Sequence, residues 1–536
     1  MIKKFRISLI LILFAFVFTI PAASFAQSPE VRRNIQKLVA LYQYIDYAYV
    51  DSVELEELVN NAIIETLKEL DPHSAFIPKK EVDRMEEPLR GSFEGIGITF
   101  QIFNDTILVI GPIPGGPSER LGIMAGDKIV KINDTVAFGE KIDNQYVFDR
   151  LRGKKGTEVD VSVYRKGRDE LIEYTIVRDK IPINSINAYF MLTPDIGYIK
   201  LDRFSNTSLQ EFKTAVTELK EQGMQKLVFD LRGNTGGYLK AAIELSDQFL
   251  DMGKLIVYTE GLRVPEQKYH STPGGSFTKG RLVILIDEGS ASASEITSGA
   301  VQDWDRGLII GRRSFGKALV QRPFILPDSS LIRLTTARYH TPTGRSIQKP
   351  YENGKEEYYL DVYKRMKNGE LIHPDSIQFP DSLKYYTPAN RVVYGGGGIM
   401  PDIFIPLDTT WISDYYTDLR RKGVLNQFTV QYVNDHREEI LSTYPVVQDY
   451  IDGFSIDEAF MNEFIEFAED MEVAYDEEGY ATSGKFLRIQ IKAWMARNLW
   501  DISASYEVFA DTDEGLIKAV EVLDDDELFS DQKIQY

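Results

Sequence analysis

Cysteine is absent from the 536-residue sequence. The chain can therefore form no disulfide, carry no lipid on a cysteine and use no thiol as a nucleophile. The folded protein must be stabilised by packing alone. Histidine is also scarce, with five residues, so few imidazole groups are available to act as a base.

Positive charge is in deficit, since 61 lysines and arginines stand against 81 aspartates and glutamates, a net charge of −20. Such acidity argues against nucleic-acid binding, because phosphate contacts need clustered positive charge. No Walker pattern and no paired-histidine helix motif occurs, so we expect no nucleotide, metal or other cofactor. Aromatic residues make up 12% of the chain, which argues against large-scale disorder.

Long apolar runs are rare, and the run near the N-terminus, Ile7–Ile20, is short for a membrane-spanning helix. It follows three basic residues and precedes small residues at Ser24 and Ala26. This pattern predicts that residues 1–26 are a signal peptide cleaved after Ala26, and that the mature protein is exported, with the periplasm as the expected compartment. The alternative is an uncleaved anchor that keeps the protein near a membrane.

The rest of the chain divides into four stretches, and its length predicts several domains. Three-and-four spacing of apolar residues predicts helices over 27–88, and short glycine-punctuated strands follow over 89–179. Alternating strands and helices over 180–406 predict a largely buried sheet. Residues 407–536 are helical, acidic and aromatic, and we expect them to pack on the core or on a second copy of the chain. The predicted fold class is α+β with several domains.

The stretch "GSFEGIGITF" places Gly95, Ile96 and Gly97 directly before a strand. Successive backbone N–H groups at such a site can bind a peptide carboxylate while the ligand adds a strand to the sheet edge. Ile98, with Val147 and Leu151 on one helix face, could line an apolar groove beside it. The order of strands, "LGIMAGDKIVKIN" and groove helix resembles a PDZ domain, which implies binding of a free C-terminus with an apolar last residue.

The stretch "EGSASASEITSGA" follows the apolar run "RLVILID" where a buried strand would turn into a helix. Serine is a favoured N-cap, and Ser292 with Glu295 has the spacing of a capping box. A serine nucleophile instead requires a base and hydrogen-bond donors for the oxyanion. Both readings of Ser292 fit this stretch taken alone.

Two candidate bases lie in the sequence. His340 is the histidine nearest the apparent core, but no carboxylate stands out as its partner, so a Ser-His-Asp triad stays open without sequence support. Lys317 follows a candidate strand, and burial would lower its pKa from about 10.4 toward a useful range. Gln321, four residues on, could hold the neutral amine. Serine–lysine pairs are a known variant of the triad.

Oxyanion donors can come from two segments. Ala293 offers its N–H at a helix N-terminus, where the helix dipole favours negative charge. In "VFDLRGNTGGYL", Gly236 and Gly237 follow a strand and leave the backbone open to substrate.

Five motifs, "DLRGNTGG", "EGSASASE", "FGKALVQ", "TTARYHTPTG" and "GGGGIMPD", occur in the order found in the C-terminal processing, or tail-specific, serine proteases. The chain resembles this family over roughly residues 34–406, including the PDZ-like stretch. Thr235 stands where proline or glycine is expected, and Ala318 replaces a usual glycine. Neither departure removes a catalytic group.

The resemblance implies a role for each matching residue. Ser292 would be the nucleophile, Lys317 the general base and Gln321 its orienting partner, while Gly237 and Ala293 would donate to the oxyanion. These roles imply an exported, ATP-independent serine endopeptidase whose PDZ domain recognises apolar C-termini of protein substrates. The alternatives are a non-catalytic PDZ scaffold that binds peptides, and an acyl hydrolase that uses the same dyad on a small substrate.

Overall fold

The chain divides into two compact units, and the boundary between them follows Glu69. The predicted signal peptide lies outside the described part of the chain, so its cleavage stays a prediction. Within that part, no helix is long and apolar enough to cross a membrane. The computed structural model describes residues 28–103, 105–377 and 379–534.

The described part of the first unit, residues 28–69, contains two helices, α2 (Pro29–Ala48) and α3 (Leu55–Lys68). Ser28 caps α2, since its hydroxyl accepts a hydrogen bond from the N–H of Val31 at 3.2 Å, and proline occupies the first helical position. No residue of α2 is buried, although apolar side chains recur along it.

The predicted helical stretch 27–88 is wrong at one point. Ala75–Ile77 form a strand, β1, which pairs antiparallel with β18 (Leu331–His340) and belongs to the second unit. Pairing with an edge gives these three residues backbone partners that an isolated turn would not supply. The helical pattern resumes as α4 (Lys79–Arg90), which ends at a left-handed glycine, Gly91.

Short antiparallel strands follow α4 and form a small β domain. Six of them form a sheet in the order β3-β4-β5-β7-β8, with β6 also paired to β5, and β2 pairs with β9. In β7, "EVDVSVY", the valines stand at every second position and all three are buried. This spacing is expected for a strand that packs one face against a core. The elements are β2 (Ser92–Gly95), β3 (Ile98–Phe103), β4 (Thr106–Pro112), α5 (Pro117–Arg120), β5 (Lys128–Ile132), β6 (Thr135–Val136), α6 (Asn144–Leu151), β7 (Glu158–Tyr164), β8 (Ile172–Val177) and β9 (Asp179–Pro182).

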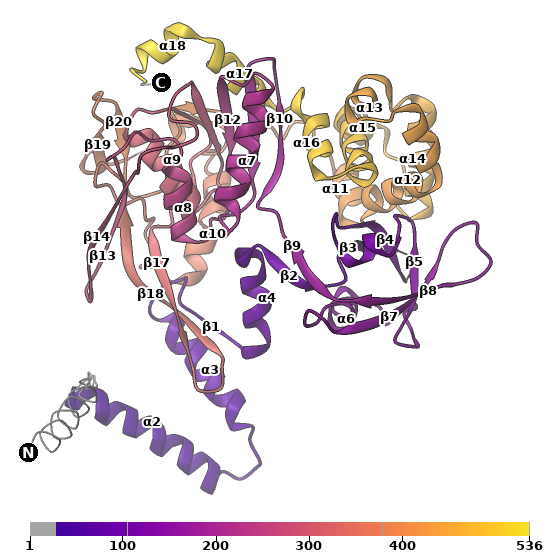
Figure 1. Cartoon of the computed structure of the whole chain (residues 1–536). Helices are drawn as coiled ribbons and strands as arrows, with labels where there is room; N and C mark the ends of the chain where they lie inside the picture. The colour runs from indigo at the N-terminus through magenta and orange to yellow at the C-terminus, as the bar shows by residue number, and fades with distance from the viewer. Residues whose placement is uncertain (1–27, 104, 378, 535–536) are drawn as a thin grey trace, which may run out of the picture. The chain divides into compact units, whose positions relative to one another are not determined.

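A six-stranded sheet in the order β10-β11-β12-β15-β16-β21 forms the centre of the second unit (Figure 1). All its pairs are parallel except β10 with β11. Helices α7, α8 and α9 share a core with one face, and α17 and α18 share a core with the other. Both faces are therefore covered, which explains why every residue of "LVILI" in β15 is buried.

These layers have the following bounds: β10 (Ile186–Met191), β11 (Ile196–Leu201), α7 (Ser208–Glu221), β12 (Lys226–Asp230), α8 (Leu239–Ser246), β15 (Leu282–Ile286), α9 (Ala293–Asp303), β16 (Leu308–Gly311), β21 (Ile403–Phe404), α17 (Glu514–Asp524) and α18 (Asp526–Asp531).

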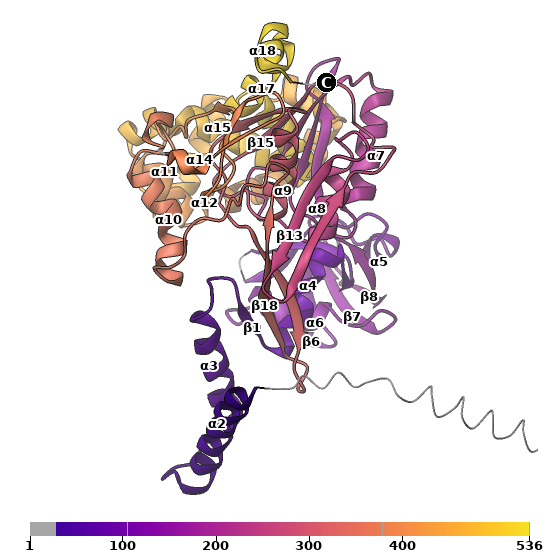
Figure 2. The same ribbon diagram turned by 90° about the vertical axis from the view of Figure 1, so that its left-hand side faces the viewer.

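A second sheet, in the order β1-β18-β13-β14 with β17 also paired to β18, lies beside the first (Figure 2). The segment around residue 317 leads directly into β17 of this sheet. The remaining bounds are β13 (Leu255–Gly261), β14 (Val264–His270), β17 (Leu319–Ile325), α10 (Lys355–Lys367), β19 (Lys384–Tyr386) and β20 (Val392–Tyr394).

The chain ends in a helical region, as the predicted fold class requires. Helices α11 to α16 bury an aromatic-rich cluster that includes Phe428 and Phe464, and the partly buried Trp411 packs against it. The mixed α/β core and the helical C-terminal region are thus confirmed. The helices are α11 (Asp414–Arg421), α12 (Val424–Thr443), α13 (Val447–Gly453), α14 (Glu458–Asp470), α15 (Glu477–Leu499) and α16 (Ile502–Ala510).

Candidate active site

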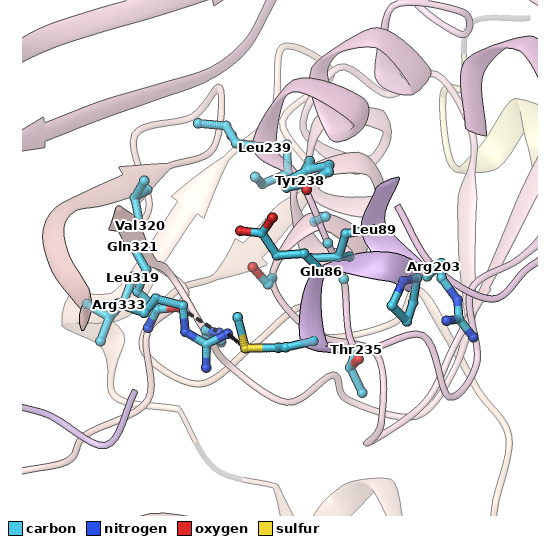
Figure 3. A pocket seen from close by; sticks show the side chains of 18 of the residues that line it. Glu86, Leu89, Arg203, Thr235, Tyr238, Leu239, Leu319, Val320, Gln321 and Arg333 are labelled. Carbon is cyan, nitrogen blue, oxygen red and sulfur yellow. Dashed lines mark hydrogen bonds between the residues drawn. The ribbon is translucent and has the colours of Figure 1, made fainter. Parts of the chain in front are cut away.

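A cavity of about 720 Å³ lies where the carboxyl end of the central sheet meets β17 and β18. It brings together all five residues for which the sequence predicted roles in catalysis: Gly237, Ser292, Ala293, Lys317 and Gln321. They come from three segments that are far apart in the sequence. Figure 3 shows part of this cavity, with Gln321 on its β17 wall.

Ser292 lies in a strained turn between β15 and α9, with φ 55° and ψ −107°. Such values are costly for a residue other than glycine and persist where the surrounding structure enforces them. The neighbouring hydroxyls are engaged: Ser290 donates to the Leu231 carbonyl at 2.8 Å, and Ser294 donates to the Asn234 carbonyl at 2.8 Å. Among the three serines, Ser292 is the one whose side chain lines the cavity.

Ser292 and Glu295 have the reciprocal arrangement of a capping box, yet the hydroxyl of Ser292 makes no cap hydrogen bond. The N–H of Glu295 instead donates to the Ser292 carbonyl at 3.0 Å. The Ser292 hydroxyl donates to no acceptor among the described residues, so its proton is available for chemistry in the cavity.

The Glu295 carboxylate is fully buried and accepts four hydrogen bonds. One oxygen accepts from the N–H groups of Ser292 at 2.7 Å and Lys317 at 2.9 Å. The other accepts from the Ser314 hydroxyl at 2.5 Å and the Gly316 N–H at 2.7 Å. Burial raises the pKa of Glu295 to about 7, although these donors oppose the shift. Glu295 thus ties the serine turn directly to the lysine segment.

The Lys317 ammonium group is buried beside the cavity. Burial, with a smaller contribution from the nearby charge of Arg333, lowers the pKa of Lys317 to about 8, against the attraction of Glu295 and Asp71. Its Nζ lies 3.4 Å from Oε1 of Gln321, at the long limit of a hydrogen bond. A substantial fraction of the amine is therefore neutral near pH 8.

The loop after β12 can lie against the serine turn because residues 236 and 237 are both glycine. A Cβ on Gly236 would lie 2.8 Å from the Ala291 carbonyl oxygen, and one on Gly237 would lie 2.0 Å from the Phe204 carbonyl oxygen. In the described part of the chain, the N–H groups of Gly237 and Ala293 donate to no protein acceptor. Both amides line the cavity and can donate to an oxyanion there.

No histidine lines this cavity. His340 lies outside it, stacked on Tyr258 with ring centroids 4.7 Å apart and with Nε2 3.3 Å from Oε1 of Glu260. His73 is buried with Nε2 2.9 Å from the Tyr358 hydroxyl, and burial lowers the pKa of His73 to about 3. Neither histidine is placed to act as the base for Ser292.

Several cavity residues were missed from the sequence. The Tyr339 hydroxyl lies 2.7 Å from the Lys317 carbonyl oxygen and 3.1 Å from that of Ser292, so it bridges the same two segments as Glu295. Tyr339 belongs to the motif "TTARYH", in which only the neighbouring His340 was considered as a functional residue. Helix α4 contributes Glu86 and Leu89 to the wall (Figure 3), although it precedes the small β domain in sequence. Nothing in the α4 sequence indicated this placement.

The predicted peptide groove is less open than its sequence suggested. Ile96, Val147 and Leu151 belong to the core of the small β domain, and Ile98 packs against them. The left-handed backbone of Gly97 (φ 74°) lets its carbonyl accept the N–H of Ile113 at 2.9 Å. The six predicted peptide-binding residues, Gly95, Ile96, Gly97, Ile98, Val147 and Leu151, therefore cluster, with their apolar members mainly buried.

Replacing Gly237 by alanine should destabilise the protein more than the same change at Gly233 in the same loop. Both glycines have positive φ, but a Cβ at Gly233 meets open space, whereas one at Gly237 meets the Phe204 carbonyl. We expect Gly237→Ala to lower the free energy of unfolding by about 1–3 kcal/mol more than Gly233→Ala, as for other overpacked sites. Urea denaturation measures both, and equal losses would show that the close approach is unimportant.

Comparison with known proteins supports the family suggested by these motifs. Residues 195–354 match the model of peptidase family S41, residues 95–176 that of the PDZ domain, and residues 415–501 that of a family of unknown function (DUF8443). The chain is 34% identical over 321 residues to a carboxy-terminal-processing protease of Bartonella bacilliformis, covering 59% of this chain and 73% of that protein.

The chain is also similar to a second relative and to a solved structure. A probable CtpA-like serine protease of Staphylococcus aureus (strain N315) is 34% identical over 316 residues, which cover 59% of this chain and 62% of that protein. Among solved structures, the photosystem II D1 C-terminal processing protease aligns with 69% of this chain and 92% of its own, at 26% identity and a TM-score of 0.35. The identity and coverage of the Bartonella protein, with the two family models, show that the chain belongs to peptidase family S41, as a serine-type peptidase of the carboxy-terminal-processing group that carries a PDZ domain.

Proposed function

We propose that the protein is an exported, ATP-independent serine endopeptidase in which Ser292 is the nucleophile and Lys317 the general base. The observation that carries this proposal is the shared cavity, which Ser292 and the partly buried Lys317 both line. A lysine with a pKa of about 8 can accept a proton near neutral pH, which an ordinary lysine cannot.

In the acylation step, neutral Lys317 takes the proton from the Ser292 hydroxyl as the oxygen attacks the scissile carbonyl carbon. The carbonyl oxygen becomes an oxyanion that accepts hydrogen bonds from the N–H groups of Gly237 and Ala293. The lysine ammonium then gives its proton to the leaving amine, and the C–N bond breaks. Gln321 accepts from the amine and holds it in place.

In the deacylation step, Lys317 takes a proton from water as the water oxygen attacks the acyl carbon. Collapse of the second oxyanion breaks the bond to Ser292, whose oxygen recovers a proton from the lysine. The chain's own groups thus suffice for both steps.

We further propose that the PDZ domain delivers substrates by their C-termini. Its helix α6 contacts α4 through a 2.9 Å hydrogen bond from Arg84 to Gln145 and an ion pair between Arg152 and Glu87. Because α4 also lines the catalytic cavity, these contacts run from the groove helix to the cavity wall. Export to the periplasm rests on the N-terminal sequence alone.

Replacing Ser292 by alanine should lower peptide cleavage by about four orders of magnitude or more while leaving the fold intact, since the nucleophile is lost. Ser290→Ala and Ser294→Ala are matched controls, because their hydroxyls bond to backbone carbonyls. We expect both to retain much of the activity in a peptide-cleavage assay. An essential Ser290 or Ser294 beside a dispensable Ser292 would refute the nucleophile.

Cleavage should rise with pH through the depressed pKa of Lys317, about 8, because only the neutral amine accepts a proton. Lys317→Arg should be inactive, since a guanidinium stays protonated at any working pH. The measurement is kcat/KM between pH 6 and pH 10 for the wild type and both Lys317→Arg and His340→Ala. Full activity in Lys317→Arg, or loss of activity in a folded His340→Ala, would identify a histidine base instead.

Peptides with a free, apolar C-terminus should bind about tenfold tighter than the same peptides with an amidated end, because the loop 94–98 is expected to hold the carboxylate by its N–H groups. A terminal Asp or Lys should also weaken binding, since its charge would be buried without a partner. Binding is measured to the full-length Ser292→Ala variant, and cleavage to the wild type. Indifference to all three changes would leave the catalytic proposal standing and refute tail recognition.

A further inference from the structure

One ion pair joins the C-terminal helical region to the loop that carries Gly237. Asp513, directly before α17, accepts two hydrogen bonds from Arg232: Nη1 to Oδ1 at 2.8 Å and Nη2 to Oδ2 at 2.8 Å. Two parallel bonds of this kind fix the plane of the guanidinium as well as its distance. Arg232 lies two residues beyond β12, whereas Asp513 lies outside the part of the chain that matches the peptidase model.

This partly exposed pair is half of a charge cluster whose other two members, Asp230 and Lys200, are buried. Arg232 also donates to Asp230, through Nη2 at 2.7 Å and Nε at 3.1 Å, and Lys200 lies 3.3 Å from the same carboxylate. Two cations, Arg232 and Lys200, thus balance two anions, Asp230 and Asp513. Removing the charge of Asp513 alone leaves an uncompensated positive charge in a largely buried site, which is strongly unfavourable.

Hydrogen bonds lead from Arg232 to the cavity. The N–H of Arg232 donates to Asp230 at 2.9 Å and its carbonyl accepts from the Lys200 ammonium, so the peptide groups on both sides of Arg232 are held. Two residues on, Asn234 accepts the N–H of Gly236 at 2.8 Å through its side chain and the N–H of Ala291 at 3.0 Å through its carbonyl. The loop is therefore fixed at its start by the charge cluster and at its end by the serine turn.

A glycine leaves room for this ion pair. A Cβ on Gly515, in the first turn of α17, would lie 2.9 Å from Nη1 of Arg232 and 3.1 Å from Oδ1 of Asp513. The backbone of Gly515 has an ordinary helical conformation that other residues adopt. Its lack of a side chain is thus explained by the close approach of the guanidinium.

We infer that Asp513 is a positioning residue for the oxyanion site: through Arg232, the C-terminal helical region fixes the loop from which Gly237 offers its N–H. This inference rests on the proposed function, because it concerns the oxyanion donors of that site. The peptidase site is then completed by a residue from outside the peptidase match.

The test compares Asp513→Asn with Asp524→Asn. Asparagine caps helices as well as aspartate does, so Asp513→Asn removes the charge and keeps the cap that Asp513 provides to α17. Asp524 is the matched control, because it pairs at 2.5 Å with Lys226 and so joins the other end of α17 to the start of β12. We expect kcat to fall by about 10- to 100-fold in Asp513→Asn, with KM nearly unchanged, and no change in Asp524→Asn.

A peptide aldehyde provides a second readout, since its adduct with Ser292 places an oxyanion against the same donors. Asp513→Asn should weaken aldehyde inhibition by a similar factor and leave binding of an uncleavable peptide amide unchanged. If Asp513→Asn does not fold, Gly515→Ala tests the inference in its place. Alanine favours the helix more than glycine does, yet its Cβ crowds the Arg232 guanidinium. It should lower kcat in the same way.

Wild-type kcat in a folded Asp513→Asn or in Gly515→Ala, a change confined to KM, or an equal loss in Asp524→Asn would each overturn the inference. None of these three outcomes contradicts the proposed roles of Ser292 and Lys317, provided that Ser292→Ala is inactive. Full activity in Ser292→Ala would instead refute the proposed function itself.

Discussion

The buried carboxylate of Glu295 is the interaction on which the catalytic arrangement depends. It accepts backbone N–H groups from the serine turn and from the lysine segment, so one side chain sets the relative positions of Ser292 and Lys317. A buried carboxylate is costly unless donors surround it, and four donors do so here. Its burial still raises the pKa to about 7, so this support is itself sensitive to pH in the neutral range.

The surroundings of Lys317 and Arg232 shift the pKa values of these two cations in opposite directions. Lys317 is partly buried and forms no ion pair with a described residue, and its burial favours the neutral form. Arg232, by contrast, lies between two carboxylates, which raise its pKa and keep it charged. In the proposed mechanism, Lys317 exchanges a proton, whereas Arg232 holds a loop. The difference comes from the partners that the fold supplies and not from the residue types alone.

The candidate catalytic residues could be named from the sequence because each lies within a short, ordered motif near the end of a strand. Ser292, Lys317 and Gly237 could be named from those motifs, and the structure places them around one cavity. Contacts between distant segments could not be predicted. Nothing local to Asp513 indicates Arg232, 281 residues away. Likewise, β1 was read as helix because its pairing with β18 is set by tertiary structure.

The central claim is that about half of the Lys317 amine is neutral near pH 8, and its titration can be observed directly. The measurement is an NMR titration of the lysine side-chain ¹³Cε signals, assigned by comparison with Lys317→Arg. We expect a pKa of about 8 for Lys317, below that of the exposed lysines. A value near the ordinary 10.5 would contradict the serine–lysine mechanism, because the base would then be protonated at working pH.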